Sequence, residues 1–519
     1  MSIPVTGEFA RGEAATRAGL LLALFGWLAA TAWVRPLALP DEGRYVGVAL
    51  EMLWSGNWLV PTLDTLPYFH KPPLFYWLTA ASLGIFGINE WAARLPSVLA
   101  ATGAAFAVYL FVGRWVGEKQ ARLALLILAT MPFLYGGAQF ANLDMLVAAC
   151  IACTILCAAD AVLAAEAGRP RRSTLAGAYA FAALGILAKG LIGIVIPGLV
   201  VGAWLVAMGR VAMILRLVWL PGLALFAAIA VPWFALMEVR HPGFLNYFFI
   251  HHHLQRYATS GFNSQRQFWF YLPVFAGLTM PWVVALIHTL RRPAAGIERD
   301  LHALMWLWLA VTLIFFSIPA SKLVGYVLAA VPPAAVLAAD GFARFVDARG
   351  GQQRWLAAMA AIALVLCTVG LAGGVLHERN GIPRLIAQAR PLPISANDEV
   401  VALRISPFAL AFYLRHRQPI RVVEDWEEPR LLQKDSWRRE LHEAANFDPA
   451  RAQAVLTTPQ AFARLLACSR RTVWVFASKD EATRQPDLAR LQPVATHGTY
   501  AIWRRPPPTA PGDRAGCEP

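Results

Sequence analysis

The chain has 519 residues, of which 58% are hydrophobic and only 15% are charged. Soluble domains carry roughly 25% charged residues, so this composition excludes an ordinary soluble protein and indicates a membrane protein. The formal net charge of +14 is typical of basic cytoplasmic loops and of contact with anionic lipids. The basic residues are scattered along the chain and form no nucleic-acid-binding motif, so we expect membrane lipids as partners and no nucleic acid.

Apolar stretches of about 20 residues, the length that a helix needs to cross a membrane, recur along most of the chain. The earliest, Leu20–Trp33, has no convincing signal-peptide cleavage site and many more follow it, so we interpret it as an uncleaved transmembrane helix. The pattern predicts a polytopic α-helical membrane protein with about 11–13 transmembrane helices. The clearest spans are at residues 17–38, 91–113, 120–138, 143–166, 174–189, 190–208, 212–236, 268–290, 301–318, 323–343 and 354–376.

Short basic linkers between the spans indicate their orientation, because cytoplasmic loops carry an excess of Lys and Arg. These linkers are at residues 114–122, 169–172, 210–216, 291–299 and 344–354. They fall at every second turn only if the apolar stretch 72–86 does not cross the membrane, so we predict a helix on the membrane surface there. The N-terminus is then cytoplasmic. The external linkers are 40–90, 137–144, the region of Lys189, 237–267 and 318–326.

After Leu376 short strands alternate with helices, which predicts a small α/β domain. Strands are expected at 399–405, 420–423, 454–457, 472–477 and 499–503, and helices at 407–415 and 429–444. We therefore expect a transmembrane domain over 1–376, a soluble external domain over 377–505 and a disordered Pro- and Gly-rich tail over 506–519. Cys468 and Cys517 lie too far apart for the sequence to pair them.

Two adjacent carboxylates, Asp41 and Glu42, follow the first membrane span. They can cap an amphipathic helix that runs to Trp54, or act as a general base or an electrostatic group in a transition state; the roles are compatible. Asp144, preceded by Asn142, supplies another carboxylate at the start of a later span on the same external face. Two carboxylates in one cavity suit glycosyl transfer, because its transition state has oxocarbenium character.

Several basic side chains stand on separate external linkers at the same membrane depth. Each alone would be a side chain that snorkels to the interface. Together they indicate a phosphate clamp, because a phosphate in a low-dielectric site calls for Arg and Lys partners, and a phosphate at this depth suggests a lipid phosphate. The residues are Lys71, Lys189, Arg256 and Lys322, with Arg44 and Tyr326.

A run of three histidines, His251, His252 and His253, lies on another external linker. Such runs are often surface or partner-contact residues, and consecutive histidines are weak evidence for a metal because ligands need convergent geometry. With His70 from a different linker, a two-histidine site for a zinc-like divalent metal is conceivable, although we expect that no cofactor is required.

The order of five short segments resembles the membrane glycosyltransferases of the GT-C type. It is most similar to the branch that contains the bacterial aminoarabinose transferase of lipid A and, more distantly, the protein O-mannosyltransferases. The similarity extends over most of the chain, including the order of the spans and the external C-terminal domain. The segments are Asp41-Glu42-x-Arg44-Tyr45, Tyr68-Phe69-x-Lys71-Pro72, Asn142-Leu143-Asp144, His253-Leu254-Gln255-Arg256-Tyr257 and Ser321-Lys322-x-x-x-Tyr326.

The resemblance implies a sugar donor carried on a polyprenyl phosphate and a site on the periplasmic face of the bacterial inner membrane. It also implies that Asp41 and Asp144 are the catalytic carboxylates, to which we add Glu42. The implied phosphate-binding residues are Lys71, Arg256 and Tyr326, with Lys189 nearby, and we include Arg44, Tyr45 and Lys322 in the substrate-binding set.

One position departs from the family pattern. Relatives often carry Glu immediately before the lysine of the second segment, whereas this chain has His70. Where relatives hold a metal ion between this position and the histidine segment, the matching pair here is His70 and His251.

The function expected from the resemblance is transfer of 4-amino-4-deoxy-L-arabinose from undecaprenyl phosphate to a lipid A phosphate by a monomer, a lipopolysaccharide modification associated with polymyxin resistance. Transfer of another sugar to a different surface glycan or protein is the alternative. A lipid-linked sugar flippase would need polar residues spread through the bilayer midplane and inverted repeats, whereas here the polar residues gather on one face. A non-catalytic lipid-binding or assembly protein would tolerate Asp41→Ala.

Overall fold

The computed structural model describes residues 7–255, 265–291, 296–433 and 436–508, which divide into two compact units. The first unit comprises Met1–Trp33, Arg94–Pro242 and Ser264–Leu371. The second comprises Val34–Ala93, Gly243–Asn263 and Ala372–Pro519. Each unit therefore combines segments that are far apart in the sequence.

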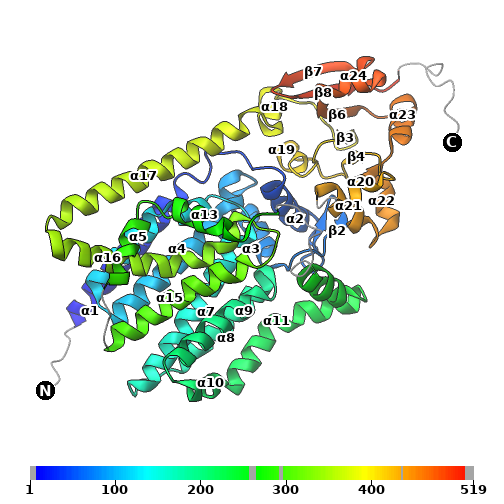
Figure 1. Ribbon diagram of the computed structural model, residues 1–519. Helices are drawn as coiled ribbons and strands as arrows, with labels where there is room; N and C mark the ends of the chain where they lie inside the picture. Colours follow the sequence, from blue (N-terminus) through cyan, green and yellow to red (C-terminus); the bar gives the residue numbers. More distant parts are fainter. Residues whose placement is uncertain (1–6, 256–264, 292–295, 434–435, 509–519) are drawn as a thin grey trace. The chain divides into compact units, whose positions relative to one another are not determined.

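The first unit is built from helices (Figure 1), and the residues of α4 and α17 are divided between the two units. The α-helices are α1 (Gly7–Ala29), α4 (Glu90–Trp115), α5 (Glu118–Thr130), α6 (Pro132–Ala138), α7 (Leu143–Glu166), α8 (Arg172–Lys189), α9 (Ile192–Ala207), α10 (Val211–Leu217), α11 (Leu220–Arg240), α13 (Tyr271–Leu278), α14 (Val283–Ile287), α15 (Gly296–Ser317), α16 (Val331–Arg349) and α17 (Gln352–His377). Short 3₁₀ helices are η2 (Phe268–Phe270), η3 (His288–Arg291) and η4 (Val324–Ala330).

Within the described ranges, six helices are long and apolar enough to cross a membrane, and the bent pair α5–α6 brings the number to seven. Shorter apolar helices cover Ala14–Ala29, Leu74–Phe86, Ile192–Ala207 and Phe268–Leu278. The prediction of a polytopic helical membrane protein is confirmed, whereas the number of crossings stays a prediction. Helix α3 (Leu74–Phe86) has 13 residues, fewer than the about 20 that a crossing needs.

Proline explains where three predicted spans are broken. The span predicted at 120–138 bends by 61° between α5 and α6, and Pro132 begins α6. The span at 212–236 is split into α10 and α11, with Pro221 in the first turn of α11. The span at 268–290 breaks before Pro281. Proline lacks the N–H for the helical hydrogen bond and clashes with the preceding turn, so it favours a helix start or a break in the helix.

Helix α7 forms the core of the first unit. It packs against α8, α9 and the short helix η4, and almost all of its residues are buried inside the protein. Its alanine-rich sequence allows this, because small side chains let neighbouring membrane helices approach closely. The two ends of α7 therefore have fixed surroundings, and the N-terminal end carries Asp144.

The second unit begins with α2 (Asp41–Ser55), the hairpin β1 (Thr62–Leu63) and β2 (Leu66–Pro67), and α3, and it includes the π-helix η1 (Asn246–Gln255). The remaining helices are η5 (Glu378–Asn380), α18 (Ile382–Gln388), α19 (Leu410–Leu414), α20 (Pro429–Gln433), α21 (Trp437–Ala445), α22 (Pro449–Val455), α23 (Pro459–Cys468), α24 (Glu481–Arg484) and α25 (Pro486–Ala489). The strands are β3 (Glu399–Leu403), β4 (Arg421–Val423), β5 (Leu456–Thr457), β6 (Val473–Ser478), β7 (Gln492–His497) and β8 (Tyr500–Arg505).

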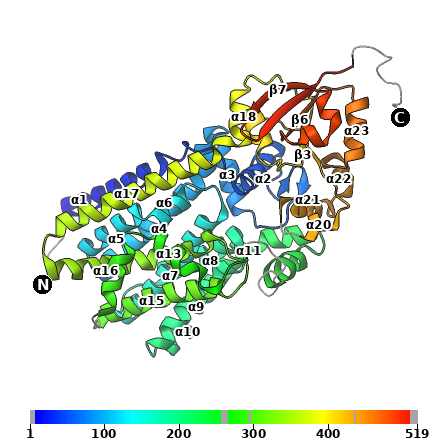
Figure 2. The same ribbon diagram turned by 45° about the horizontal axis from the view of Figure 1, so that its top comes forward.

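The C-terminal strands form one six-stranded sheet in the order β5-β4-β3-β6-β8-β7. Strands β3, β6 and β7 are labelled in Figure 2. Strands β3 to β6 are parallel, and β8 and β7 are antiparallel additions. Alternate residues of β3 serve opposite faces: Val401 and Leu403 belong to the apolar cluster that includes α23, and Val400 and Ala402 to the cluster that includes α18. Both faces are covered, as a parallel sheet requires.

The five predicted strands are confirmed, and one strand was missed. Strand β7 reads Gln-Pro-Val-Ala-Thr-His, lies at the edge of the sheet and is largely exposed. An exposed edge strand that contains proline carries little of the apolar alternation that identifies a strand. Cys468, at the end of α23, is disulfide-bonded.

Two C-terminal helices complete the second unit by packing on its N-terminal part. Helix α19 contacts α2, and α21 contacts β2. The loop that follows the first membrane span is therefore joined to the C-terminal sheet in one compact body. This places acidic residues of α21 near the segment that begins at Asp41.

Candidate functional site

Arg44 is the centre of a charged cluster in the second unit. Helix α2 begins at Asp41, and the three-residue spacing brings Asp41 and Arg44 to one face, where they form an ion pair. The other end of the guanidinium contacts both carboxylate oxygens of Glu440 on α21. The Arg44 side chain is 11% exposed and that of Asp41 is 47% exposed, so Asp41 keeps a carboxylate edge open to a ligand.

The surroundings of Arg44 are aromatic as well as acidic. Its guanidinium carbon lies 5.0 Å from the centre of the Tyr45 ring. Burial alone would lower the pKa of Arg44, but the nearby charge of Glu440, and further that of Asp41, raise it well above its usual value. In the described part of the chain its Nε has no hydrogen-bond partner although it is buried.

Glu42 has the opposite environment from its neighbour Asp41. Its side chain is 0% exposed and lies 2.7 Å from the guanidinium of Arg35. The same oxygen accepts the backbone N–H of Ala38 at 2.7 Å. The carboxylate therefore holds the chain that leads into α2, although no side chain of the described residues caps the first turn of this helix. The catalytic assignment of Glu42 stays a prediction that this geometry does not favour.

His70 lies beside a second acidic residue of α21. Its ring stacks on Tyr68, with ring centres 4.7 Å apart, and its Nε2 is 3.7 Å from a carboxylate oxygen of Glu443. That carboxylate also accepts the hydroxyl of Tyr247 at 3.4 Å and the Nε–H of Arg439 at 2.7 Å. Lys71 follows His70 in the half-buried turn before α3.

The described residues do not complete a metal site. His70 and Glu443 offer one imidazole and one carboxylate, but no three His, Cys, Asp or Glu side chains converge in the part of the chain that the structure describes. His251 lies in η1, and its side chain is outside the described residues, as is the whole of Arg256. The metal stays a prediction, and so does the phosphate role of Arg256.

The first unit holds a separate cluster around Asp144, at the start of α7. The side chain of Asn142 caps this helix by accepting the N–H of Asp144 at 3.0 Å, and its amide donates to the Asp144 carboxylate at 3.1 Å. Lys189, the last residue of α8, forms an ion pair with the same carboxylate. Its ammonium also lies 4.3 Å from the centre of the Tyr326 ring.

Gly325 explains how η4 comes so close to this cluster. A Cβ atom at Gly325 would lie 2.1 Å from a carboxylate oxygen of Asp144. Only glycine leaves room for the carboxylate, and the next residue, Tyr326, then reaches Lys189. Asp144, Lys189 and Tyr326 therefore form one built cluster.

Lys322 is placed differently from Lys189. Its side chain is buried, and its ammonium donates to the carbonyl oxygens of Pro319 and, at 3.1 Å, Arg266. These contacts hold together the two loops that precede η2 and η4. Lys322 is thus occupied by backbone acceptors, and its assignment to a phosphate stays a prediction.

The structure groups the predicted residues into two sets. Asp41, Arg44 and Tyr45 are together in the second unit, and Asp144, Lys189 and Tyr326 are together in the first. Convergence of the two sets on one cavity stays a prediction. The sequence reasoning missed three residues of α21, namely Arg439, Glu440 and Glu443; its run of charges was visible, but nothing local indicated which segment it meets.

Comparison with known proteins shows what the chain as a whole resembles. Residues 70–235 match the family model described as dolichyl-phosphate-mannose-protein mannosyltransferase. The chain is 30% identical over 359 residues to undecaprenyl phosphate-alpha-4-amino-4-deoxy-L-arabinose arabinosyl transferase 1 of Pseudomonas fluorescens (strain Pf0-1), covering 68% of this chain and 62% of that protein. It is 31% identical over 311 residues to the corresponding transferase of Shewanella sediminis, covering 59% of this chain and 56% of that protein.

These matches span less than two thirds of the length of the curated relatives. The structural similarity is more extensive. The crystal structure of ArnT from Cupriavidus metallidurans bound to undecaprenyl phosphate aligns with a TM-score of 0.77 and 25% identity, covering 95% of this chain and 98% of that one. In sequence and in fold the chain is therefore similar to the aminoarabinose transferases, and over residues 70–235 to the family described as dolichyl-phosphate-mannose-protein mannosyltransferase, as the GT-C resemblance predicts.

Proposed function

We propose that the chain transfers a sugar from undecaprenyl phosphate to an acceptor on the periplasmic face of the inner membrane, with 4-amino-4-deoxy-L-arabinose as the sugar and a lipid A phosphate as the acceptor. The observation that carries this proposal is the structural match over 95% of the chain to a protein with undecaprenyl phosphate bound. The names of the relatives at 30–31% identity supply the sugar.

The reaction exchanges one phosphate for another at the anomeric carbon. The bond from this carbon to the donor phosphate breaks, and polyprenyl phosphate leaves with the bonding electrons. An oxygen of the acceptor phosphate then forms the new bond. Because the acceptor oxygen is already anionic, no general base is needed and no proton has to move.

Asp41 is proposed to act electrostatically in this reaction. Its exposed carboxylate can face the positive charge that develops at the anomeric centre, and Arg44 holds it in place.

Lys189 is proposed to stabilise the leaving phosphate. Asp144 and the Tyr326 ring hold its ammonium in one place, so the positive charge is preorganised before the substrate binds. Asp144 then positions Lys189. This positioning role of Asp144 differs from the direct catalytic role expected from the resemblance. Substitution of Asp144 and of Lys189, each on its own, distinguishes the two roles.

Substitution of Asp41 by Asn is the direct test. Transfer is measured by mass spectrometry with purified protein, undecaprenyl phosphate-aminoarabinose and lipid A. We expect a loss of at least about 100-fold in kcat/KM, which is about 2.7 kcal/mol of transition-state stabilisation. Asp425→Asn removes an exposed carboxylate of the C-terminal domain and should leave the rate unchanged. Activity of Asp41→Asn near that of wild type would contradict the proposed role of Asp41.

The same assay, together with mass spectrometry of cells, distinguishes the alternative functions. A flippase moves its lipid without forming a product, so it produces no modified lipid A in detergent solution. If the acceptor is a different glycan or a protein, mass spectrometry of cells with and without the chain should show the loss of a sugar there and no change in lipid A. Treatment with a chelator should leave the rate unchanged, because no step above uses a metal.

The location is supported by two observations. The six long apolar helices make the chain a multi-pass membrane protein. Cys468 is disulfide-bonded, and disulfides persist in oxidising compartments such as the periplasm. We therefore propose that the C-terminal domain is periplasmic and the protein lies in the inner membrane.

A further inference from the structure

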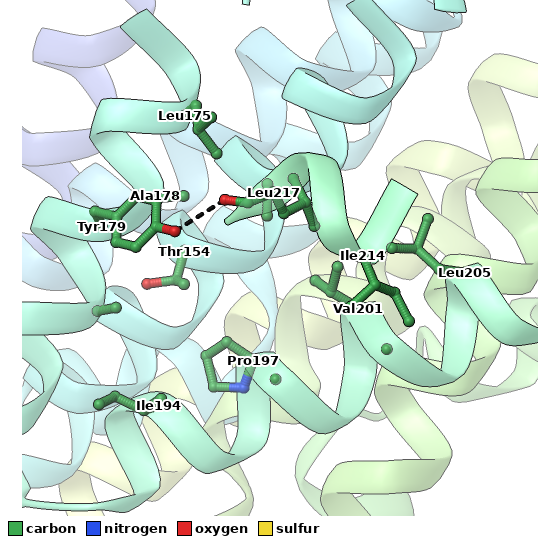
Figure 3. A pocket seen from close by; sticks show the side chains of 14 residues that line it. Thr154, Leu175, Ala178, Tyr179, Ile194, Pro197, Val201, Leu205, Ile214 and Leu217 are labelled. Atoms are coloured by element: carbon green, nitrogen blue, oxygen red, sulfur yellow. Dashed lines mark hydrogen bonds between the residues drawn. The ribbon is translucent and has the colours of Figure 1, made fainter. Parts of the chain in front are cut away.

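A cavity of about 280 Å³ lies among α7, α8, α9 and α10 in the first unit. Figure 3 shows the side chains that line it, with Leu175 and Tyr179 contributed by α8, and Ile214 and Leu217 contributed by α10. Almost all of these side chains are aliphatic. The cavity is separate from the cluster at the start of α7: Thr154, which lines it, is ten residues beyond Asp144, or about 15 Å along the helix.

The few polar groups of the cavity are already hydrogen-bonded. The Thr154 hydroxyl donates to the carbonyl of Cys150 at 2.8 Å. The Tyr179 hydroxyl donates to the carbonyl of Leu217 at 2.8 Å, drawn as a dashed line in Figure 3, and accepts the N–H of Trp219 at 3.2 Å. An occupant therefore finds no polar partner inside the cavity, which selects for hydrocarbon.

The cavity is open to the surface of the helical unit. Ile214 is 37% exposed, and its neighbour Leu215 on α10 is 76% exposed. On α9 a Cβ atom at Gly198 or Gly202 would meet nothing within 4 Å, so no packing of helix against helix fills this space. In a membrane protein such a surface faces lipid, and an empty apolar cavity would lose dispersion contacts on all its walls.

Two arginines that are close in sequence to residues lining the cavity have no acidic partner among the described residues. Arg172 begins α8 one turn before Leu175, and Arg216 lies between Ile214 and Leu217 on α10. Neither forms an ion pair within the described part of the chain, and the one polar side-chain contact of Arg216 is with the sulfur of Met213. By contrast, Arg210 nearby is paired with Glu166 and Asp300.

We propose that the cavity binds one acyl chain of an anionic glycerophospholipid, whose phosphate is held by Arg172 and Arg216. Apolar walls select the chain, and the two unpaired guanidinium groups select a negative headgroup, in the way that basic pockets between membrane helices recognise anionic lipids. Both arginines lie on linkers predicted to be cytoplasmic. The lipid would then come from the inner leaflet, and the site does not depend on the proposed transferase activity.

The headgroup contact is tested by native mass spectrometry of the full-length protein titrated with phosphatidylglycerol or phosphatidylethanolamine of the same chain length. We expect wild type to retain phosphatidylglycerol at least fivefold more tightly, and Arg172→Gln or Arg216→Gln to lower that preference. Arg354→Gln removes an exposed arginine from another predicted cytoplasmic linker and should change nothing. Equal retention of the two lipids by wild type would overturn the proposal.

The cavity itself is tested with Gly198→Leu, which fills it, and Gly198→Ala, which adds only one methyl group. We expect Gly198→Leu to lose the phosphatidylglycerol adduct and Gly198→Ala to keep it. Both variants should elute as a single species and keep the wild-type melting temperature, which excludes misfolding as the cause. Retention of the adduct by folded Gly198→Leu, or its replacement by polyprenyl phosphate in the wild-type protein, would overturn the proposal.

Discussion

Asp41 and Glu42 are adjacent in the sequence and differ completely in their surroundings. Asp41 is half-exposed and pairs with Arg44, whereas Glu42 is fully buried against Arg35. A carboxylate that is open to a ligand can act on a substrate, and one that is enclosed by its own chain stabilises the fold. Substitution of Asp41 should therefore lower activity, whereas substitution of Glu42 should lower stability.

Replacement of Glu42 by Ala should destabilise the protein by about 3–5 kcal/mol, because it removes the partner of the buried Arg35 charge. Asp41→Ala should cost less than about 1 kcal/mol, since its ion pair is partly exposed. Thermal unfolding in detergent measures both. Equal melting temperatures for the two variants would contradict the structural role of Glu42.

The cluster of Asp144, Lys189 and Tyr326 depends on Gly325. Gly325→Ala should place its methyl group against the Asp144 carboxylate, displace it from Lys189 and lower kcat by at least about 100-fold, since a shift of 1 Å costs this much. Gly136→Ala is the matched control, because a Cβ atom there meets nothing within 4 Å. A normal rate for Gly325→Ala would show that the Asp144–Lys189 contact is dispensable.

At the scale of elements, the β1–β2 hairpin joins the segment after the first membrane helix to the C-terminal sheet. Asp64, in the turn of this hairpin, accepts the N–H of Ile420 at 2.8 Å, immediately before β4. Burial, and then the charge of the nearby Glu51, raise the pKa of Asp64 well above its usual value. Its raised pKa makes this connection sensitive to pH.

Asp64→Asn should remove that sensitivity. A raised pKa means that the folded state binds the proton more tightly than the unfolded state. The contribution of Asp64 to stability is therefore full below about pH 3.9, and it is lost as the pH rises through the raised pKa of Asp64. The variant should match wild type near pH 4 and be more stable at pH 7, by about 1.4 kcal/mol for each unit of the pKa shift. Asn tolerates the positive φ of 52° at this position.

Melting temperatures measured between pH 4 and pH 8 test this expectation. Asp425→Asn, at an exposed site, should follow the wild-type profile. A difference between Asp64→Asn and wild type that does not change with pH would show that Asp64 is ionised equally in the folded and unfolded states.

Helix α21 connects the C-terminal domain to Arg44 through Glu440. Glu440→Gln removes the charge that faces the guanidinium, so we expect Arg44 to lose its fixed position and kcat to fall about tenfold or more with little change in KM. Glu440→Asp, which keeps the charge, should recover part of the rate. Glu427→Gln, at an exposed position of the same domain, is the control. A normal kcat for Glu440→Gln would show that α21 only packs.

At the scale of the whole molecule, orientation in the membrane follows from the distribution of basic linkers. We expect alkaline phosphatase fused after residue 508 to be active in cells and a green fluorescent protein fused there to be dark, because the first folds only in the periplasm and the second only in the cytoplasm. Fusions after residue 212, in a basic linker, should give the reverse result. An active phosphatase at both sites would reject the predicted orientation.

Membrane class, helix positions and the positions of the C-terminal strands could be predicted from the sequence because each depends on local composition. A helix must be apolar over the bilayer, and a buried parallel strand must be apolar on both faces. The prediction from sequence failed where proline broke a span, as at Pro132 and Pro281. It also missed the exposed edge strand β7.

The sequence also predicted site roles for Asp41, Arg44, Asp144 and Lys189, because charged groups beside membrane spans are expensive and are kept for function, and for Tyr326 by resemblance. It could not assign their partners. That Glu440 meets Arg44 across 396 positions, or that Gly325 makes room for Asp144, depends on long-range packing that no local pattern encodes. Burial distinguishes the adjacent residues Asp41 and Glu42, and it is known only from the folded structure, which exposes Asp41 and encloses Glu42.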